Sequence, residues 1–201
     1  AALDVGAHGY CEKPLVSSLE EGDRVVVRAR EVGRKIAVAH QAVYLPRVQY
    51  VKNILQQGRI GEIQAIYAHG KQDGRGGGED MLVLGTHLFN MMRFFAGDVS
   101  WISAHVTMDG RELEPGDVRE ATEPVGLVAG DCVNSYFAFE SGVAGFFDSR
   151  KDQATAAGTP YGLDIIGSDG RISLGGGAAD ALMIYPHSLH APADSSQGWQ
   201  P

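Results

Sequence analysis

The spacing of apolar residues predicts helices separated by short strands over the first half of the chain. Residues 19–32 have the apolar spacing of an amphipathic helix, which Ser17 to Glu21 can begin as a capping box and Gly33 can end. The same reasoning predicts two further helices and three short strands, at residues 46–58 and 76–96 for the helices and at 9–11, 35–40 and 62–69 for the strands.

The second half of the chain changes to strand-like runs. Five strands are expected, at residues 101–108, 131–139, 143–149, 161–166 and 171–174. Gly142 and Gly170 fit hairpin turns, because glycine adopts positive φ without steric cost. Consecutive strands after helices predict a largely antiparallel sheet. The polar residues 111–130 are expected to be a mobile connection. Five aromatic residues are expected to pack the sheet: Trp101, Phe137, Phe139, Phe146 and Phe147.

The composition limits the partners that the protein can bind. Its 201 residues carry 17 basic and 25 acidic side chains, a formal charge of −8, which disfavours nucleic acid and anionic membrane surfaces. No apolar stretch approaches the roughly 20 residues that cross a bilayer. The two cysteines, Cys11 and Cys132, lie in apolar strand-like segments without metal-ligand spacing. We therefore expect a reduced, cytoplasmic protein with no bound metal.

Glu12, Lys13 and Pro14 directly follow the predicted strand at residues 9–11. Pro14 fixes its own backbone and favours an extended conformation at Lys13. Ligands of open α/β sheets bind just outside the carboxyl ends of strands, so Lys13 is placed where chemistry is expected. A Lys-Pro step that leaves a strand is also a common turn, and the tripeptide alone does not separate the two interpretations.

Two motifs in order resemble the Gfo/Idh/MocA family of NAD(P)-dependent oxidoreductases. The first is Glu12-Lys13-Pro14, and the second is the Gly-Arg-Ile-Gly-Glu-Ile segment of residues 58–63, which joins a helix to a strand. The resemblance implies an α/β (α+β) fold in two parts. Residues 1–43 would be the C-terminal part of a Rossmann dinucleotide-binding domain, and residues 44–201 an α/β domain with a large, mostly antiparallel open sheet. No Gly-x-Gly-x-x-Gly follows an early strand, so we expect a fragment lacking the N-terminal half of the Rossmann domain.

The resemblance implies roles for the residues around the tripeptide. Lys13 would lie beside the nicotinamide and the substrate hydroxyl. The Lys13–Pro14 bond is a candidate for the cis form, which is nearly always a proline feature. Glu12, Pro14 and His40 would contact the cofactor together with Lys13, and that cofactor would be NAD or NADP.

The resemblance also identifies His87, within the predicted helix, as the family's motif histidine. Its implied role is general base, or orienter of the substrate hydroxyl. Alcohol oxidation needs a base near neutral pH, which the unperturbed pKa of histidine, about 6.5, provides. The Lys13 ammonium can stabilise the developing alkoxide. Val83 stands four residues earlier, where the family carries an aspartate on the same helix face. A helix histidine among leucines and methionines is otherwise more often a core residue.

Candidates for binding the substrate are Tyr44, Lys71, Asp80 and Asn90, the last standing where many family members carry a second acid. Glu79 is an alternative to Asp80. The three glycines at residues 76–78 lack the Lys-Ser/Thr of a phosphate loop, so we expect a flexible entry to the helix. His187 and His190 lie off any regular element, which is weak evidence for a metal.

The family implies hydride transfer between a nicotinamide cofactor and a CH–OH group or ketone of a sugar, polyol or inositol-like compound. Two alternatives stay open: a non-catalytic member that binds a ligand or assembles, suggested by Val83, and an NAD-dependent glycosidase. In the family, one face of the large sheet covers the active site and the other usually forms a subunit interface. We therefore expect a homo-oligomer that binds a small-molecule substrate.

Overall fold

The computed structural model describes residues 2–154, 158, 160–176, 181–188 and 198. The N-terminal part is a strand–helix–strand unit in which β1 (Gly9–Cys11) pairs in parallel with β2 (Ile36–Val38) and α1 (Leu19–Glu31) connects them. A 3-10 turn (Leu3–Val5) precedes it. As predicted, Ser18 Oγ accepts the Glu21 N–H at 3.2 Å at the start of α1, and Gly33 follows its end with a left-handed φ of 62°.

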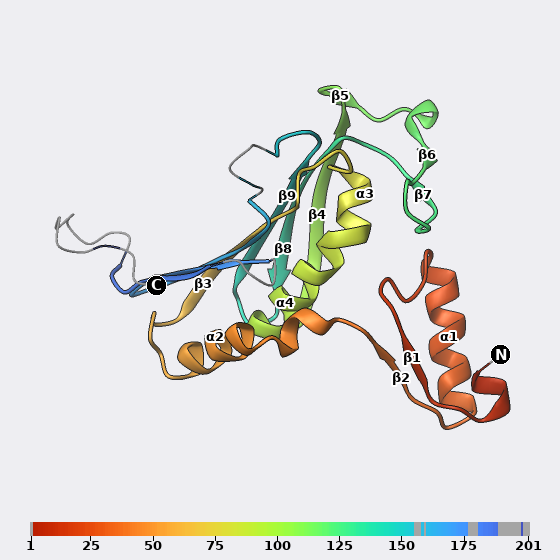
Figure 1. Cartoon of the computed structure of the whole chain (residues 1–201), viewed down its shortest axis with the longest axis horizontal. Helices are drawn as coiled ribbons and strands as arrows, with labels where there is room; N and C mark the ends of the chain where they lie inside the picture. Colours follow the sequence, from red (N-terminus) through yellow and green to blue (C-terminus); the bar gives the residue numbers. More distant parts are fainter. Residues whose placement is uncertain (1, 155–157, 159, 177–180, 189–197, 199–201) are drawn as a thin grey trace.

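Two helical segments lie between this unit and the strands of the second half (Figure 1). A 3-10 turn (Gln41–Tyr44) leads into α2 (Pro46–Gln56). The predicted helix at 76–96 is present but is built in three parts: α3 (Gly78–Asp80), a π-helical segment (Met81–Gly85) and α4 (Thr86–Ala96). Gly97 ends it with a φ of 90°.

The main sheet has eight strands in the order β12-β11-β10-β3-β9-β8-β4-β5. Only β3 and β9 pair in parallel, so the expectation of a mostly antiparallel sheet is confirmed. The strands span Ile63–His69 (β3), Val99–Met108 (β4), Arg111–Glu112 (β5), Cys132–Phe139 (β8), Ala144–Arg150 (β9), Gly162–Gly167 (β10), Arg171–Gly175 (β11) and Leu182–Tyr185 (β12). β12 was not predicted.

One face of the sheet packs against α2 and α4 and forms the core (Figure 1). Ile66 of β3 and Phe147 of β9 point into it and are almost fully buried, and side chains of this size contribute about 1.5–3 kcal/mol each when buried. Gly145 allows the close approach of α4, because a Cβ there would lie 2.6 Å from Met92 Cε. No helix in the described ranges is long and apolar enough to cross a membrane.

The opposite face of the sheet carries a row of contacting aromatic rings across β3, β9, β8 and β4. Tyr67 stacks on Phe146 at 4.7 Å, Phe146 meets Tyr136 edge-on at 5.4 Å, and Tyr136 contacts Trp101 at 5.0 Å. Trp101 is 55% exposed. Two of the five aromatic residues predicted to pack the sheet, Trp101 and Phe146, therefore contribute to this open face, whereas Phe137, Phe139 and Phe147 belong to the core.

The segment expected to be a mobile connection is instead built from short paired elements. We call residues 111–128 the arm. It comprises β5, a 3-10 turn (Pro115–Asp117), and a hairpin of β6 (Arg119–Glu120) with β7 (Leu127–Val128). Figure 1 shows this hairpin reaching from the top of the sheet toward the loop that follows β1. Polar residues of this segment, among them Arg119 and Thr122, have partners elsewhere in the fold.

Candidate functional site

Lys13 reaches from the end of β1 to the helical segment of the second half. The Lys13–Pro14 peptide bond is cis, and Lys13 Nζ donates a hydrogen bond of 2.6 Å to the backbone carbonyl of Val83, 70 residues along the chain. His40 follows β2, which is parallel to β1, so both residues stand at the same edge of this pair. This is the edge at which open α/β folds bind ligands.

Position 83, where the resemblance implies an aspartate, contributes its backbone to the contact with Lys13. Val83 is 2% exposed and packs with Val125 and Val128 of the arm, while the His87 ring lies beside His40. The backbone carbonyl of Val83 is the acceptor that holds Lys13.

His87 and His40 form an edge-on pair whose ring centroids are 6.0 Å apart. The Nδ1 atom of each ring is buried and has no hydrogen-bond partner among the described residues. Burial lowers the pKa of both histidines, and the nearby Lys13 ammonium lowers each further. A desolvated imidazole without a carboxylate partner stays neutral at pH 7 and can accept a proton.

The remaining predicted site residues lie at different distances from this centre. Glu12 is exposed, and with Lys13 and Pro14 it lines a cavity described below. Tyr44 is 78% exposed at the end of its 3-10 turn, and Asn90 is half-buried on α4. The roles of Glu12, Pro14, Tyr44 and Asn90 toward a cofactor or a substrate stay predictions.

Lys71 and Asp80 are engaged by protein groups. Lys71 Nζ lies 3.6 Å from Asp73 Oδ2. Asp80 is fully buried, and its Oδ2 atom accepts hydrogen bonds from Ser149 Oγ at 2.6 Å and from the Gln72 N–H at 3.3 Å. Substrate binding by either residue stays a prediction.

Glu79, next to Asp80, is a fully buried carboxylate that bonds the arm. Its Oε1 atom accepts the Thr122 N–H at 2.7 Å, the Thr122 hydroxyl and the Glu123 N–H at 3.3 Å, and its Oε2 atom accepts from Arg119 at 2.8 Å. Burial by itself would raise the pKa of Glu79, but the bonds from Thr122 and Arg119 outweigh burial and the pKa is lowered.

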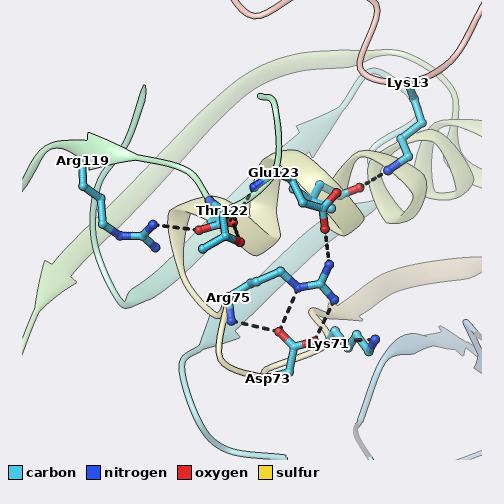
Figure 2. A network of polar contacts seen from close by, with 9 residues as sticks. Lys13, Lys71, Asp73, Arg75, Arg119, Thr122 and Glu123 are labelled. Carbon is cyan, nitrogen blue, oxygen red and sulfur yellow. Dashed lines mark hydrogen bonds and ion pairs between the residues drawn. The ribbon is translucent and has the colours of Figure 1, made fainter. Parts of the chain in front are cut away.

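Arg75 makes a second attachment to the arm, beside the first (Figure 2). Its guanidinium binds both carboxylate oxygens of Asp73, at 3.2 and 2.8 Å, and also donates to Glu123 of the arm. The hydrogen bonds from Arg75 lower the pKa of Asp73 to about 2. Sequence reasoning missed Arg75, Arg119 and Glu123, because their partners lie far away in sequence and no local motif marks them.

A cavity of about 340 Å³ separates the tip of the arm from the loop after β1. It is lined on one side by residues 12–17 and on the other by Glu123, Pro124 and Val125. No group of three or more His, Cys, Asp or Glu side chains within the described ranges could hold a metal ion. The His187 ring contacts Tyr185 edge-on, and His190 lies outside the described residues.

The fold and the site define an α/β protein in which a lysine at the end of a parallel strand meets the helix that carries a buried histidine. Residues 48–173 match the family model described as the GFO/IDH/MocA C-terminal domain, and the chain belongs to this family. The match falls within the predicted second domain. The predicted boundary between residues 43 and 44 is not tested by it.

Named relatives include two sugar-related enzymes. Levoglucosan dehydrogenase from Pseudarthrobacter phenanthrenivorans is 25% identical over an alignment of 211 residues. The match covers 92% of this chain and 53% of the relative. The 1,5-anhydro-D-fructose reductase of Ensifer adhaerens is 29% identical over 110 residues, which cover 49% of this chain and 33% of the relative. The chain thus spans between a third and about half of the length of these relatives.

Solved structures share the fold over nearly the whole chain. Levoglucosan dehydrogenase in complex with NADH and L-sorbose matches with a TM-score of 0.75 at 22% identity, over 99% of this chain and 55% of that chain. An inositol dehydrogenase homologue from Azotobacter vinelandii, complexed with NADH and myo-inositol, matches with a TM-score of 0.71 at 18% identity, over 95% of this chain and 50% of that chain. At such identities the likeness establishes the fold alone.

Proposed function

We propose that this protein is an NAD(P)-dependent oxidoreductase that acts on the CH–OH group, or the corresponding ketone, of a sugar, polyol or inositol-like compound. The observation that carries the proposal is the 2.6 Å bond from Lys13 Nζ to the Val83 carbonyl, one helical turn before His87. It brings the lysine of the first motif to the helix that carries the motif histidine. Family membership and the dehydrogenase and reductase relatives support the same reaction class.

The residues present fit the nicotinamide end of such a cofactor. Residues 12–14 and His40 follow two parallel strands, at the edge where a dinucleotide fold places its ligand. The Nδ1 atoms of His40 and His87 are buried without a partner among the described residues, which is unusual unless a ligand completes the site. When bound, NAD(P) supplies the hydride acceptor or donor. Whether it is NAD or NADP is open.

Each residue of the centre has a role that matches its environment. His87, kept neutral by burial, accepts the proton of the substrate hydroxyl during oxidation. Lys13 stabilises the negative charge that develops on that oxygen, and the Val83 carbonyl keeps its ammonium in place. Tyr44, Lys71, Asp80 and Asn90 would contact the substrate, as the sequence predicts.

We further propose that the protein is a homo-oligomer that uses the open face of the main sheet. The row from Tyr67 to Trp101 supports this, because exposed aromatic rings in contact with one another are enriched at interfaces. The molar mass measured in solution by light scattering should be a multiple of the chain mass. The double variant with Trp101→Lys and Tyr67→Lys should lower the measured molar mass toward that of a single chain.

Turnover by the full-length natural protein tests the proposed reaction. NAD or NADP is supplied with a panel of neutral sugars, polyols and inositols, and reduced nicotinamide is followed by absorbance. Oxidation of at least one compound, lost in Lys13→Met and His87→Gln but retained in Lys35→Met, is the expected result. Lys35 is the control because it is an exposed lysine of the same unit. Normal turnover by Lys13→Met would refute the assigned role.

A non-catalytic ligand-binding member is the second candidate, favoured by the apolar surroundings of Val83, where the family carries an aspartate. Tight binding of NAD(P) by the full-length protein, without turnover of any compound in the panel, would support this candidate. Release of an aglycone that needs only catalytic NAD would instead identify the glycosidase.

A further inference from the structure

We infer that the arm is a fixed wall of the reaction site, with Glu79 as the positioning residue that holds it and the Glu123–Val125 tip as the part that selects neutral over anionic substrates. This inference rests on the proposed function, since it names the substrate class of the same site. It draws on three sets of contacts: the carboxylate anchor, the packing beneath the arm and the charges that line the cavity.

The anchor is unusual because a fully buried carboxylate makes no bond to its own helix and four to the arm. Glu79 accepts from Thr122 twice, from the Glu123 N–H and from Arg119 (Figure 2). Bonds between charged partners are about twice as strong as neutral ones. Removal of the Glu79 carboxylate would leave the donors of Thr122, Glu123 and Arg119 without their acceptor. The bonds of Glu79 therefore hold the arm in place.

The chain next to the arm's C-terminal end is held against the glycines before Glu79. A Cβ on Gly77 would lie 2.5 Å from the Gly130 carbonyl oxygen, and one on Gly78 would lie 2.2 Å from that of Ala129. The three glycines were expected to be a flexible helix entry, but here they allow two backbone segments to touch. This close contact fixes the start of α3 and the end of the arm together.

The tip of the arm is seated on the segment that holds Lys13. Val125 and Val128 pack on the Val83 side chain, while the Val83 carbonyl accepts Lys13 Nζ. Glu123, Pro124 and Val125 then face Glu12 and Lys13 across the 340 Å³ cavity. A displaced arm would therefore remove one wall of the cavity and the packing behind the lysine's acceptor at the same time.

The charges around the cavity favour a neutral substrate. Its lining carries two carboxylates, Glu12 and Glu123, and one cation, Lys13, which is bonded to the Val83 carbonyl. Glu123 is paired with Arg75, but that guanidinium is shared with Asp73, so two carboxylates compete for one cation. Lys71 adds only a solvent-screened pair with Asp73. The nearby His40 and His87 are uncharged at pH 7, because burial and the Lys13 ammonium lower the pKa of each. A sugar acid or sugar phosphate would thus meet net negative charge, which rejects it, whereas hydroxyl groups can donate to the carboxylates.

Two substitutions in the full-length protein test the inference, with one matched control. Glu79→Gln keeps the size of the side chain but removes its charge and one acceptor. It should raise the KM of a neutral polyol roughly tenfold while kcat changes less than about threefold. The reason is that the displaced arm no longer contacts the bound substrate, whereas the reacting groups stay in place. It should also speed trypsin cleavage within residues 111–130. Glu120→Gln, an exposed acid on β6, should leave all three quantities unchanged.

Glu123→Gln tests the selection of charge. The ratio of kcat/KM for a neutral polyol to that for the matching sugar acid should fall about tenfold, since one repelling charge is removed. If Glu79→Gln does not fold, as judged by thermal unfolding, Arg119→Gln replaces it, because Arg119 is partly exposed and the same KM change is expected.

The inference and the proposed function fail in different ways. A wild-type protein that oxidises no neutral polyol refutes the function, and unchanged cleavage of the arm in Glu79→Gln then overturns the anchor as well. In an active enzyme, a Glu79→Gln variant with wild-type KM would show that the arm is not a wall of the reaction site. An unchanged selectivity ratio in Glu123→Gln would show that Glu123 does not select by charge.

Discussion

The Lys13–His87 centre and the anchor of the arm both involve the helical segment of residues 78–96, which Lys13 reaches from the loop after β1. The two regions differ in how their buried polar atoms are satisfied. At the anchor, both oxygens of Glu79 accept bonds from the arm. At the centre, the Nδ1 atoms of His40 and His87 are buried with no partner among the described residues. Only Lys13 is bonded, and to a main-chain carbonyl rather than to a carboxylate.

The difference separates groups that hold the fold from groups that are available to a ligand. Buried polar atoms are nearly always paired in folded proteins, because an unpaired one costs about 1–3 kcal/mol. Two neighbouring histidines with unpaired Nδ1 atoms are therefore expected where a ligand supplies the missing hydrogen-bond partner. Titratable groups with perturbed pKa values cluster at such sites. Four substitutions test this separation, in order of decreasing effect.

His87→Gln should have the largest effect, lowering kcat/KM for alcohol oxidation by roughly a thousandfold, since it removes the general base. The pH dependence of the wild-type enzyme tests the same role of His87. The base acts when neutral and burial lowers its pKa from 6.5, so the midpoint of the acidic limb should lie below pH 6.5. An acidic limb with its midpoint above pH 7 would contradict the role of burial.

Lys13→Met should lower kcat/KM by roughly a hundredfold, because the alkoxide loses its cationic donor. The loss should appear mainly in kcat. NAD(P) affinity, measured by fluorescence titration, should change by less than about threefold, since the lysine acts on the developing charge. A variant that loses cofactor binding but keeps kcat would instead make Lys13 a cofactor ligand only.

Val83→Asp tests the residue that both regions share. Its side chain contacts Val125 and Val128, so an aspartate would bury a carboxylate among apolar groups. The free energy of unfolding should fall by about 2–4 kcal/mol, and the arm should become more sensitive to protease. Val83→Ala, which buries no charge, should cost less. A stable Val83→Asp enzyme in which the midpoint of the acidic limb is raised would instead show that a carboxylate at position 83 pairs with His87.

Local signals in the sequence were enough for much of the fold. The cap at Ser18, the end of α1 at Gly33 and the end of α4 at Gly97 depend on neighbouring residues only, and each was predicted. The strands of the arm and β12 were not predicted, because their order comes from distant partners rather than from local signals. Length alone is not the reason, since β1 and β2 are three residues long and were expected.

Motifs nominated Lys13 and His87 for the candidate site, and their roles stay predictions. The structure joins the elements that carry these two residues through Val83. The contact of Lys13 with the main-chain carbonyl of Val83 has no side-chain signature, so no motif could mark it. The anchor was missed for another reason. Glu79 is separated from Thr122 by 43 residues, and only the folded chain brings them together.

The substitution with the smallest expected effect is at His69 on β3. In contrast to the His87 ring, the His69 ring is flanked by two carboxylates. Its Nδ1 lies 2.5 Å from Asp148 Oδ1 and its Nε2 lies 3.7 Å from Asp164 Oδ2. The hydrogen bond with Asp148 is the main cause that raises the pKa of His69, to about 9. His69 is therefore an imidazolium at pH 7, in contrast to His87.

A raised pKa in the folded state means that the ion pair stabilises fully below pH 6.5 and that this contribution is lost as the pH rises through about 9. His69→Gln should lower the free energy of unfolding at pH 6 by about 1 kcal/mol, a modest value because Asp148 is partly exposed and solvent screens the pair. Chemical denaturation should show the difference from wild type shrinking between pH 6.5 and pH 9. His105→Gln, which removes a far more exposed pair with Glu112, should change stability at neither pH. A difference that grows with pH would mean that His69 is neutral in the fold and that the contrast with His87 does not hold.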